Sequence, residues 1–187
     1  ASFQVPQQGV EHQLPMPQVP PPEELRDMDT HHREMIPQIP QKLQQLFEHQ
    51  RPFEFRPVRM PDFFSREKLE PIKHVWLRAV DQPPRDQPLQ RCLLAYVSDY
   101  HLLDTATLPH GVSWLRRDVR LASIDHAMWF HADVELNDWL LYCIDSPSAS
   151  GARGFARGSI FSRAGKLVAS TAQEGLIRVQ TLPPGGQ

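Results

Sequence analysis

Residues 89–108 are the one stretch of this chain that is apolar over most of a helix circumference. At about 100° per residue, its apolar side chains fall on one broad arc and its polar side chains collect opposite. The arc contains Leu89, Cys92, Leu93, Ala95, Tyr96, Tyr100, Leu103 and Ala106, and the opposite side contains Gln90, Arg91, Ser98, His101, Asp104 and Thr105. The pattern predicts one long helix whose wide apolar face is covered by another element.

Asp99 interrupts this apolar arc, because its direction falls between those of Cys92 and Ala106. A buried, ionised carboxylate loses hydration unless hydrogen-bond donors replace the water. Two interpretations therefore stay open. Asp99 is either an acid with a chemical role or a solvated acid at the rim of the buried face.

Strand-like runs flank the predicted helix on both sides. Two β-rich runs precede it and four follow it, and the last four are joined by short turns at 137–138, 148–151 and 164–165. The predicted strands span 53–60, 72–80, 120–135, 139–146, 154–162 and 166–179. This order predicts an α+β fold in which a curved antiparallel sheet wraps around one long helix.

Proline shapes the beginning of the chain, since 11 of the 19 prolines occur before residue 63. We expect residues 4–40 to be an extended linker, because proline excludes regular helix and central strand. A short amphipathic helix is expected over 39–49. The chain opens on Ala1-Ser2-Phe3 without a methionine, so we expect a processed or partial sequence.

Composition narrows the class of protein. A net charge of −2 provides no positive surface potential that would attract nucleic acid, so nucleic-acid binding is not indicated. No apolar run is long enough to cross a membrane. Cys92 and Cys143 lack CxxC spacing, which is typical of buried thiols in a reducing compartment. His126 and His131 are five apart in a predicted strand and therefore point to opposite faces. We expect no metal and no other cofactor.

Several polar residues stand out on the predicted strands. Ser123 alternates with apolar neighbours, and Gln173 is the large polar member of a row that also holds Leu167, Ala169, Thr171 and Ile177. A buried glutamine needs partners for its carbonyl and its amide, which backbone groups can also provide. Arg153 and Arg157 share a strand face that suits a phosphate, although exposed arginines serve solubility equally well.

Five ordered runs resemble one known family. They are LLAYVSDYHLL (93–103), LPHG (108–111), LASIDHAMWFH (121–131), NDWLLYCIDSPSASGARGFARGSIF (137–161) and LVASTAQEGLIR (167–178). Over about residues 51–179 the chain resembles the carboxy-terminal hotdog domain of acyl-CoA thioesterase II, the TesB type. The resemblance implies a hotdog fold and hydrolysis of fatty acyl-CoA to free acid and coenzyme A.

The resemblance also implies site residues and domain limits. The family's catalytic Asp, hydroxyl residue and Gln fall on Asp99, Ser123 and Gln173. We expect these three to hold a water that attacks the thioester, with Asp99 as general base, because no GxSxG elbow or Cys/His pair offers a covalent nucleophile. The resemblance further implies three segments. Residues 1–40 are the end of a missing amino-terminal hotdog followed by a linker, residues 41–180 are a hotdog domain, and residues 181–187 are a flexible tail.

Weaker expectations concern ligands and partners. Arg116, Arg117 or Arg153 is expected to meet the phosphates of coenzyme A. We expect the partner to be an amino-terminal hotdog half or a second copy, because a single hotdog leaves a sheet edge and an apolar face uncovered. The carboxy terminus carries no Ser-Lys-Leu signal, so a cytoplasmic location is expected.

Two other functions stay open at this point. A hotdog hydratase acting on enoyl-CoA needs a catalytic Asp/His pair, for which His110 is the candidate near the helix. A non-catalytic hotdog half that binds acyl-CoA, or has only a structural role, is the alternative outside enzymes.

Overall fold

The computed structural model describes residues 2–5, 7–39, 41, 44 and 51–180 of the 187-residue chain. Within these described residues, seven strands and three α-helices form the regular part. They are α1 (Met28–Met35), β1 (Phe53–Pro57), β2 (Ile72–Ala79), α3 (Gln87–Val97), α4 (Leu102–Thr105), β3 (Val119–Ser123), β4 (Ala127–Phe130), β5 (Leu140–Ser150), β6 (Arg153–Ser162) and β7 (Leu167–Val179). The helix expected over 39–49 falls largely outside the described residues.

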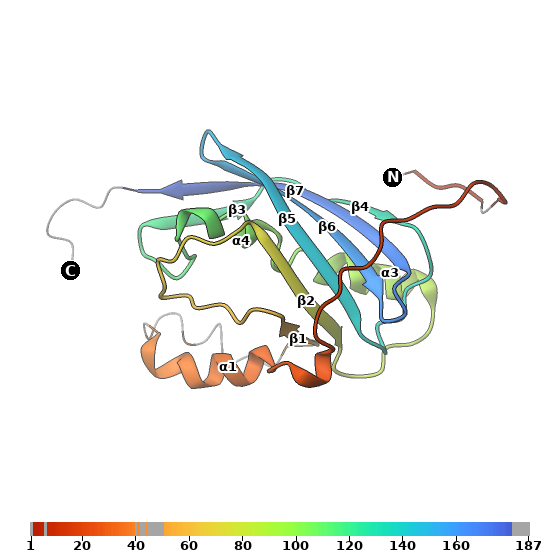
Figure 1. Cartoon of the computed structure of the whole chain (residues 1–187), viewed down its shortest axis with the longest axis horizontal. Coiled ribbons are helices and arrows are strands. Elements are labelled where there is room, and N and C mark those ends of the chain that lie inside the picture. Colours follow the sequence, from red (N-terminus) through yellow and green to blue (C-terminus); the bar gives the residue numbers. More distant parts are fainter. Residues whose placement is uncertain (1, 6, 40, 42–43, 45–50, 181–187) are drawn as a thin grey trace, which may run out of the picture.

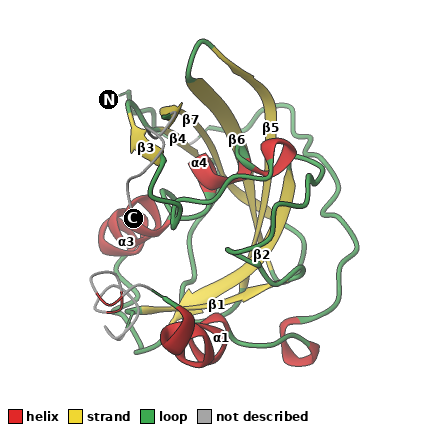
Figure 2. Ribbon diagram, turned by 90° about the vertical axis from the view of Figure 1, so that its left-hand side faces the viewer, coloured by secondary structure: helices red, strands yellow, loops and turns green. Residues whose placement is uncertain are grey.

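The strands form one antiparallel sheet in the order β1-β2-β5-β6-β7-β3, with β4 also paired to β7. Viewed along its edge, the sheet curves, and α3 and α4 lie on its inner side (Figure 2). The main apolar core fills this concave side and includes Leu94 and Val97 of α3, Leu102 of α4 and Tyr142 of β5. The expected α+β hotdog architecture is confirmed.

The expectation of a single long helix over 89–108 is wrong, because the helix ends after Val97. α3 begins at an Asp86 cap, whose carboxylate accepts from the Leu89 amide at 3.1 Å, and ends at Ser98. His101 then adopts a left-handed conformation with a φ of 70°, and the four residues of α4 follow. A left-handed residue cannot continue a right-handed helix, so Asp99 lies in a turn and not within a helix.

The buried face of α3 also differs from the predicted arc. Gln90 and Ser98, expected on the solvent side, are fully buried, whereas Cys92 and Tyr96 are exposed. Gln90 is tolerated inside because its amide donates to the Pro84 carbonyl at 2.8 Å and accepts from the Leu136 amide at 2.9 Å. Backbone groups of the flanking loops therefore decide which face turns inward.

The strands follow the expected runs, with two differences. The run expected over 120–135 is two strands, β3 and β4, separated by a bulge at residues 124–126. β5 extends to Ser150 and meets β6 at a tight hairpin, where Gly151 and Ala152 have φ values of 57° and 59°. Two consecutive positive φ values are what a type I′ hairpin turn requires.

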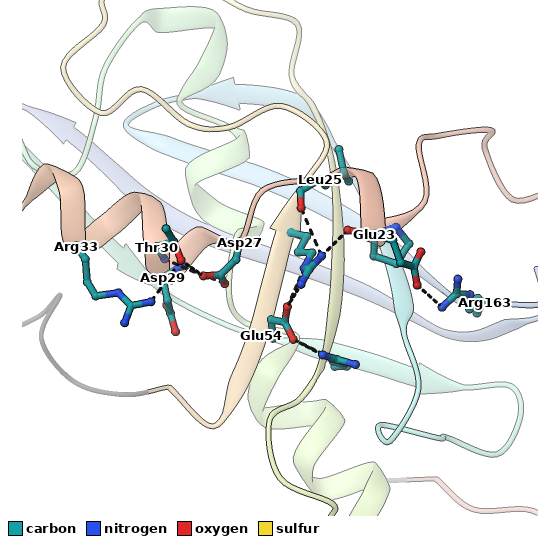
Figure 3. Close-up of polar contacts among 11 residues, drawn as sticks. Glu23, Leu25, Asp27, Asp29, Thr30, Arg33, Glu54 and Arg163 are labelled. Carbon is teal, nitrogen blue, oxygen red and sulfur yellow. Dashed lines mark hydrogen bonds and ion pairs between the residues drawn. The ribbon is translucent and has the colours of Figure 1, made fainter.

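The extended linker expected over 4–40 contains a regular helix, α1, so the expectation that proline excludes helix there is wrong. Asp27 caps α1, since its carboxylate accepts from the Asp29 and Thr30 amides at 3.3 and 2.8 Å, and α1 lies beside β1 (Figures 2 and 3). Before it, residues 13–25 run across the outer face of the sheet, opposite α3 (Figure 1). We call residues 13–25 the amino-terminal strap.

The strap covers a second apolar cluster on the outer face of the sheet. Met16, Val19 and Leu25 pack against a buried cluster that the sheet and the loop before β5 supply. That cluster consists of Trp76, Trp139, Leu141 and Phe161. Burying large aromatic side chains is strongly favourable, so the strap is part of the folded unit.

Polar contacts hold the strap at both ends. Gln13 donates to the Gly165 carbonyl at 2.8 Å and accepts from the Leu167 amide at 3.0 Å. At the other end, Arg56 of β1 donates to the Pro22 carbonyl at 2.8 Å, and Glu23 pairs with Arg163 at 2.8 Å (Figure 3).

Among the described residues no helix is both long and apolar enough to cross a membrane.

Candidate functional site

Asp99, Ser123 and Gln173 meet at one point, although they come from three different parts of the fold. Asp99 lies in the turn after α3, Ser123 ends β3, and Gln173 lies in the middle of β7. The Ser123 hydroxyl donates to Asp99 Oδ1 at 3.4 Å, and the Gln173 amide nitrogen donates to the same oxygen. The structure therefore brings the three predicted residues together around a single carboxylate oxygen.

The three side chains differ in their contact with solvent. Asp99 and Ser123 are exposed, whereas Gln173 is only 1% exposed. Gln173 Oε1 is buried and has no hydrogen-bond partner among the described residues. An unpaired buried acceptor is costly, and the Gln173 carbonyl therefore differs from the amide nitrogen, which has a partner in Asp99.

A buried tyrosine fixes the end of α3 on which Asp99 depends. The Tyr142 hydroxyl of β5 donates to the Ser98 carbonyl at 2.8 Å and accepts from the Thr171 hydroxyl at 2.8 Å. Burial raises the pKa of Tyr142 far above its usual range, which keeps this hydroxyl neutral and able to donate. The turn that carries Asp99 is thus anchored to β5 and β7.

A cleft of about 360 Å³ opens beside Asp99 and Ser123. Its walls are mainly apolar and come from α1, the loop after β1, the α3–α4 turn and β3. Those apolar side chains include Met28, Phe63, Leu103, Trp114 and Leu121. An apolar surface that carries the Asp99 carboxylate and the Ser123 hydroxyl suits a substrate whose reactive carbonyl follows an acyl chain.

Buried titratable groups border the same cleft. Burial lowers the pKa of His101 to about 4, and its ring packs edge-on against Phe55 with 5.1 Å between centroids. Asp104 pairs with Lys73 of β2 at 2.7 Å. Since His101 is neutral near pH 7, the cleft has no positive charge from this ring.

The arginines predicted to bind phosphates lie outside the lining of this cleft. Arg116 pairs with Asp118 at 2.5 Å, and Arg153 pairs with Glu174 at 3.2 Å. Arg117 is exposed in the loop before β3. Arg157, which we considered with Arg153, pairs with Asp145 at 2.5 Å. Their role in binding stays a prediction.

His126 was not among the predicted site residues, yet it contacts the site. Its Nε2 lies 2.8 Å from the Ser98 hydroxyl, and its Nδ1 lies 3.4 Å from the Gln173 amide nitrogen. Strict alternation along one strand puts Ser123 and His126 on opposite faces, and only the bulge at 124–126 reverses this.

Of the two cysteines expected to be buried, Cys92 is exposed, whereas burial raises the pKa of Cys143 to about 12.

Comparison with known proteins shows the family. A family model described as acyl-CoA thioesterase matches residues 42–176. The chain is 43% identical to acyl-CoA thioesterase 2 of Haemophilus influenzae, covering 95% of this chain and 62% of that protein. It is 37% identical to human acyl-coenzyme A thioesterase 8, covering 96% of this chain and 58% of that protein. The chain thus spans about three-fifths of the length of these relatives.

A solved structure gives the same result at the level of the fold. The crystal structure of the acyl-CoA thioesterase II TesB2 from Mycobacterium marinum superposes with a TM-score of 0.70 at 35% identity, covering 98% of this chain and 62% of that one. A protein from Alicyclobacillus acidocaldarius described as having a hot dog fold superposes with a TM-score of 0.66 at 18% identity, covering 95% of this chain and 60% of that one. Fold and sequence similarity agree, and the chain belongs to the acyl-CoA thioesterase family.

Proposed function

We propose that this chain carries the hydrolytic site of an acyl-CoA thioesterase, which converts fatty acyl-CoA to free fatty acid and coenzyme A. The observation that supports it most is the convergence of Asp99, Ser123 and Gln173 on one carboxylate oxygen beside an apolar cleft. The family to which the chain belongs carries the same activity in its name.

In this proposal a water molecule held at Asp99 attacks the thioester carbonyl carbon. Asp99 accepts a proton from the water as the new C–O bond forms, and the C–S bond then breaks. The coenzyme A thiolate leaves and takes up a proton. The Ser123 hydroxyl and the Gln173 amide nitrogen fix the carboxylate that holds the water.

Direct attack by water fits the site better than attack by Ser98. Ser98 and His126 are hydrogen-bonded, as a nucleophile and its base are. Ser98 is fully buried, however, and its hydroxyl donates to the Ala95 carbonyl at 2.9 Å. A serine without access to the cleft cannot form an acyl-enzyme.

Replacing the carboxylate tests the proposal. Asp99→Asn keeps the size of the side chain and removes the base, so we expect kcat to fall by about 10²- to 10⁴-fold with a nearly unchanged melting temperature. The measurement is release of the coenzyme A thiol from a long-chain acyl-CoA. Asp133→Asn is the matched control, because Asp133 is exposed and pairs with Arg91 at 3.2 Å. Turnover by Asp99→Asn at the wild-type rate refutes the assignment.

The predicted phosphate contacts are tested in the same assay. Arg117 is the first arginine to replace, because it is exposed, whereas Arg116 and Arg153 pair with carboxylates. Arg117→Gln is expected to raise the KM for acyl-CoA several-fold with unchanged kcat, since phosphate contacts act equally on ground state and transition state. An unchanged KM removes Arg117 from the substrate site.

The exposed apolar surface favours a partner domain as part of the working protein. Leu89 and Tyr96 of α3 are 39% and 55% exposed, and Trp129 and Phe130 of β4 are 54% and 38% exposed. The two elements adjoin, because the Arg91 guanidinium lies 5.9 Å from the Phe130 ring centroid. β4 also pairs with β7 alone, which leaves its other edge open among the described strands. We expect an amino-terminal hotdog or a second copy to cover this surface.

This surface also supports the second candidate function, a hotdog half that binds acyl-CoA and hydrolyses it only with its partner. Thiol release and mass in solution distinguish the cases, measured for the chain alone and mixed with an amino-terminal hotdog. Activity of a dimer of this chain means that a second copy completes the site. Activity only on mixing identifies one half of an enzyme. Thermal stabilisation by acyl-CoA without thiol release in either sample favours the binding role.

A further inference from the structure

The bulge between β3 and β4 gives the site a residue that regular alternation excludes. Ser123 pairs with Gly175 and Ala127 pairs with Ala172, so three residues of this strand face two residues of β7. The amides of Ile124 and Asp125 donate to the Glu174 carbonyl at 2.9 and 3.3 Å. The extra residue shifts the alternation by one, which turns both Ser123 and His126 toward the α3–α4 side.

The bulge is held in place from both strands. Asp125 Oδ1 accepts from the Glu174 amide at 2.7 Å, which complements the two hydrogen bonds to the Glu174 carbonyl. Glu174 is the neighbour of Gln173 on β7. The segment that presents His126 is therefore fixed directly against the strand that carries Gln173.

The hydrogen-bond partners of His126 determine which ring nitrogen carries the proton. The Ser98 hydroxyl gives its own hydrogen to the Ala95 carbonyl, so it accepts from His126 Nε2 at 2.8 Å. The Gln173 amide nitrogen has only hydrogens to give, so His126 Nδ1 accepts at 3.4 Å. These two requirements together assign a neutral imidazole with its proton on Nε2.

We propose that His126 is a positioning residue for the hydrolysis proposed above, on which this inference rests. The two hydrogens of the Gln173 amide go to Asp99 Oδ1 and to His126 Nδ1. This fixes the plane of the amide, and with it the hydrogen bond from the Gln173 amide nitrogen to the Asp99 carboxylate that takes the proton of the water. When Asp99 takes the proton of the water, it becomes a weaker acceptor, and His126 keeps the amide from rotating.

Two variants of similar size separate this role from packing. The amide of asparagine reaches about as far as Nδ1 of histidine, and the amide of glutamine reaches about as far as Nε2. His126→Asn therefore keeps an acceptor for Gln173, and His126→Gln keeps only the contact to Ser98. We expect His126→Gln to lower kcat by about 10- to 100-fold and His126→Asn to stay within about threefold of wild type, both with little change in KM.

A matched control shows that the effect belongs to this histidine. His131 lies close to His126 in the sequence, is exposed, and contacts the Ser170 hydroxyl at 2.9 Å. His131→Gln is expected to leave kcat and KM unchanged. Equal kcat values for His126→Asn and His126→Gln overturn the proposal, because packing alone then accounts for the residue.

An NMR experiment tests the hydrogen bonds without requiring activity. Long-range ¹H–¹⁵N spectra of the full chain are expected to show His126 with Nε2 protonated and Nδ1 unprotonated. In Gln173→Leu, the Nδ1 resonance is expected to move toward that of a nitrogen without a donor. A proton on Nδ1 in the wild-type chain overturns the proposal. If the chain shows the predicted spectra but hydrolyses no thioester, the proposed function fails and the hydrogen-bond assignment stands.

Discussion

Gln90 provides the sharpest test of how α3 is seated. It is fully buried, and its side chain satisfies two backbone groups, the Pro84 carbonyl and the Leu136 amide, at 2.8 and 2.9 Å. Gln90→Leu keeps the approximate volume and deprives both groups of their partner. Each buried group left unpaired costs about 1–3 kcal/mol, while the leucine regains part of this as apolar burial. We expect a net loss of about 3 kcal/mol in the free energy of unfolding.

For a chain of this length, 1 kcal/mol shifts the melting temperature by about 2–4 °C, so Gln90→Leu should melt about 10 °C below wild type. Circular dichroism measures the transition, and hydrogen exchange at the Leu136 amide should accelerate in the variant. Gln82→Leu is the control, because Gln82 is exposed and its replacement should cost less than about 0.5 kcal/mol. A melting temperature for Gln90→Leu within 2 °C of wild type refutes the idea that these two hydrogen bonds fix the buried face of α3.

Three further predictions concern packing, pH and the strap. Gly158→Ala places a Cβ 2.2 Å from the Tyr142 ring, so we expect a loss of about 1–3 kcal/mol in urea unfolding, and wild-type stability contradicts this. Burial lowers the pKa of His101 to about 4 from its usual value of 6.5, so the contribution of His101 to stability is complete above pH 6.5 and is lost as pH falls toward 4. In a pH series of urea unfolding, His101→Asn should flatten this slope, and exposed His110→Asn should not. Trp76→Phe removes the indole donor to the strap at 2.9 Å, so limited proteolysis should cut the strap faster; an unchanged cleavage rate argues against this anchor.

The order and type of the strands were predictable because proline, glycine and short polar turns mark their ends. The hairpin at Gly151 and the turn at Gly165, where φ is 86°, lie within the segments predicted as turns. The helix break was not predictable from local chemistry, since residues 89–108 contain neither glycine nor proline. The break occurs at His101, whose backbone is left-handed. The Thr105 hydroxyl donates to the His101 carbonyl at 2.6 Å and stabilises this turn.

The candidate site was accessible from the sequence only in part. Asp99, Ser123 and Gln173 were noticeable as polar residues among apolar ones, and the resemblance joined the three in one site. The angle used for Asp99 assumed a continuous helix, so it indicated the residue but not its surroundings. The position of His126 depends on one extra residue in a strand, and alternation carries no signal for a bulge. The partners that the strap finds on the sheet lie far away in sequence, and composition alone indicated an open linker.

The strap determines a late event in folding. Gln13 bonds to Gly165 and Leu167, which follow it by 152 and 154 residues, so these two bonds form only when the start of β7 has been synthesised. Until the strap docks, Trp76 and its apolar neighbours on the outer face stay uncovered. Contacts of such long sequence separation slow folding and prolong the exposure of sticky surface. Docking of the amino-terminal strap thus completes the cover of this apolar cluster. The chain is most prone to aggregate just before the strap docks.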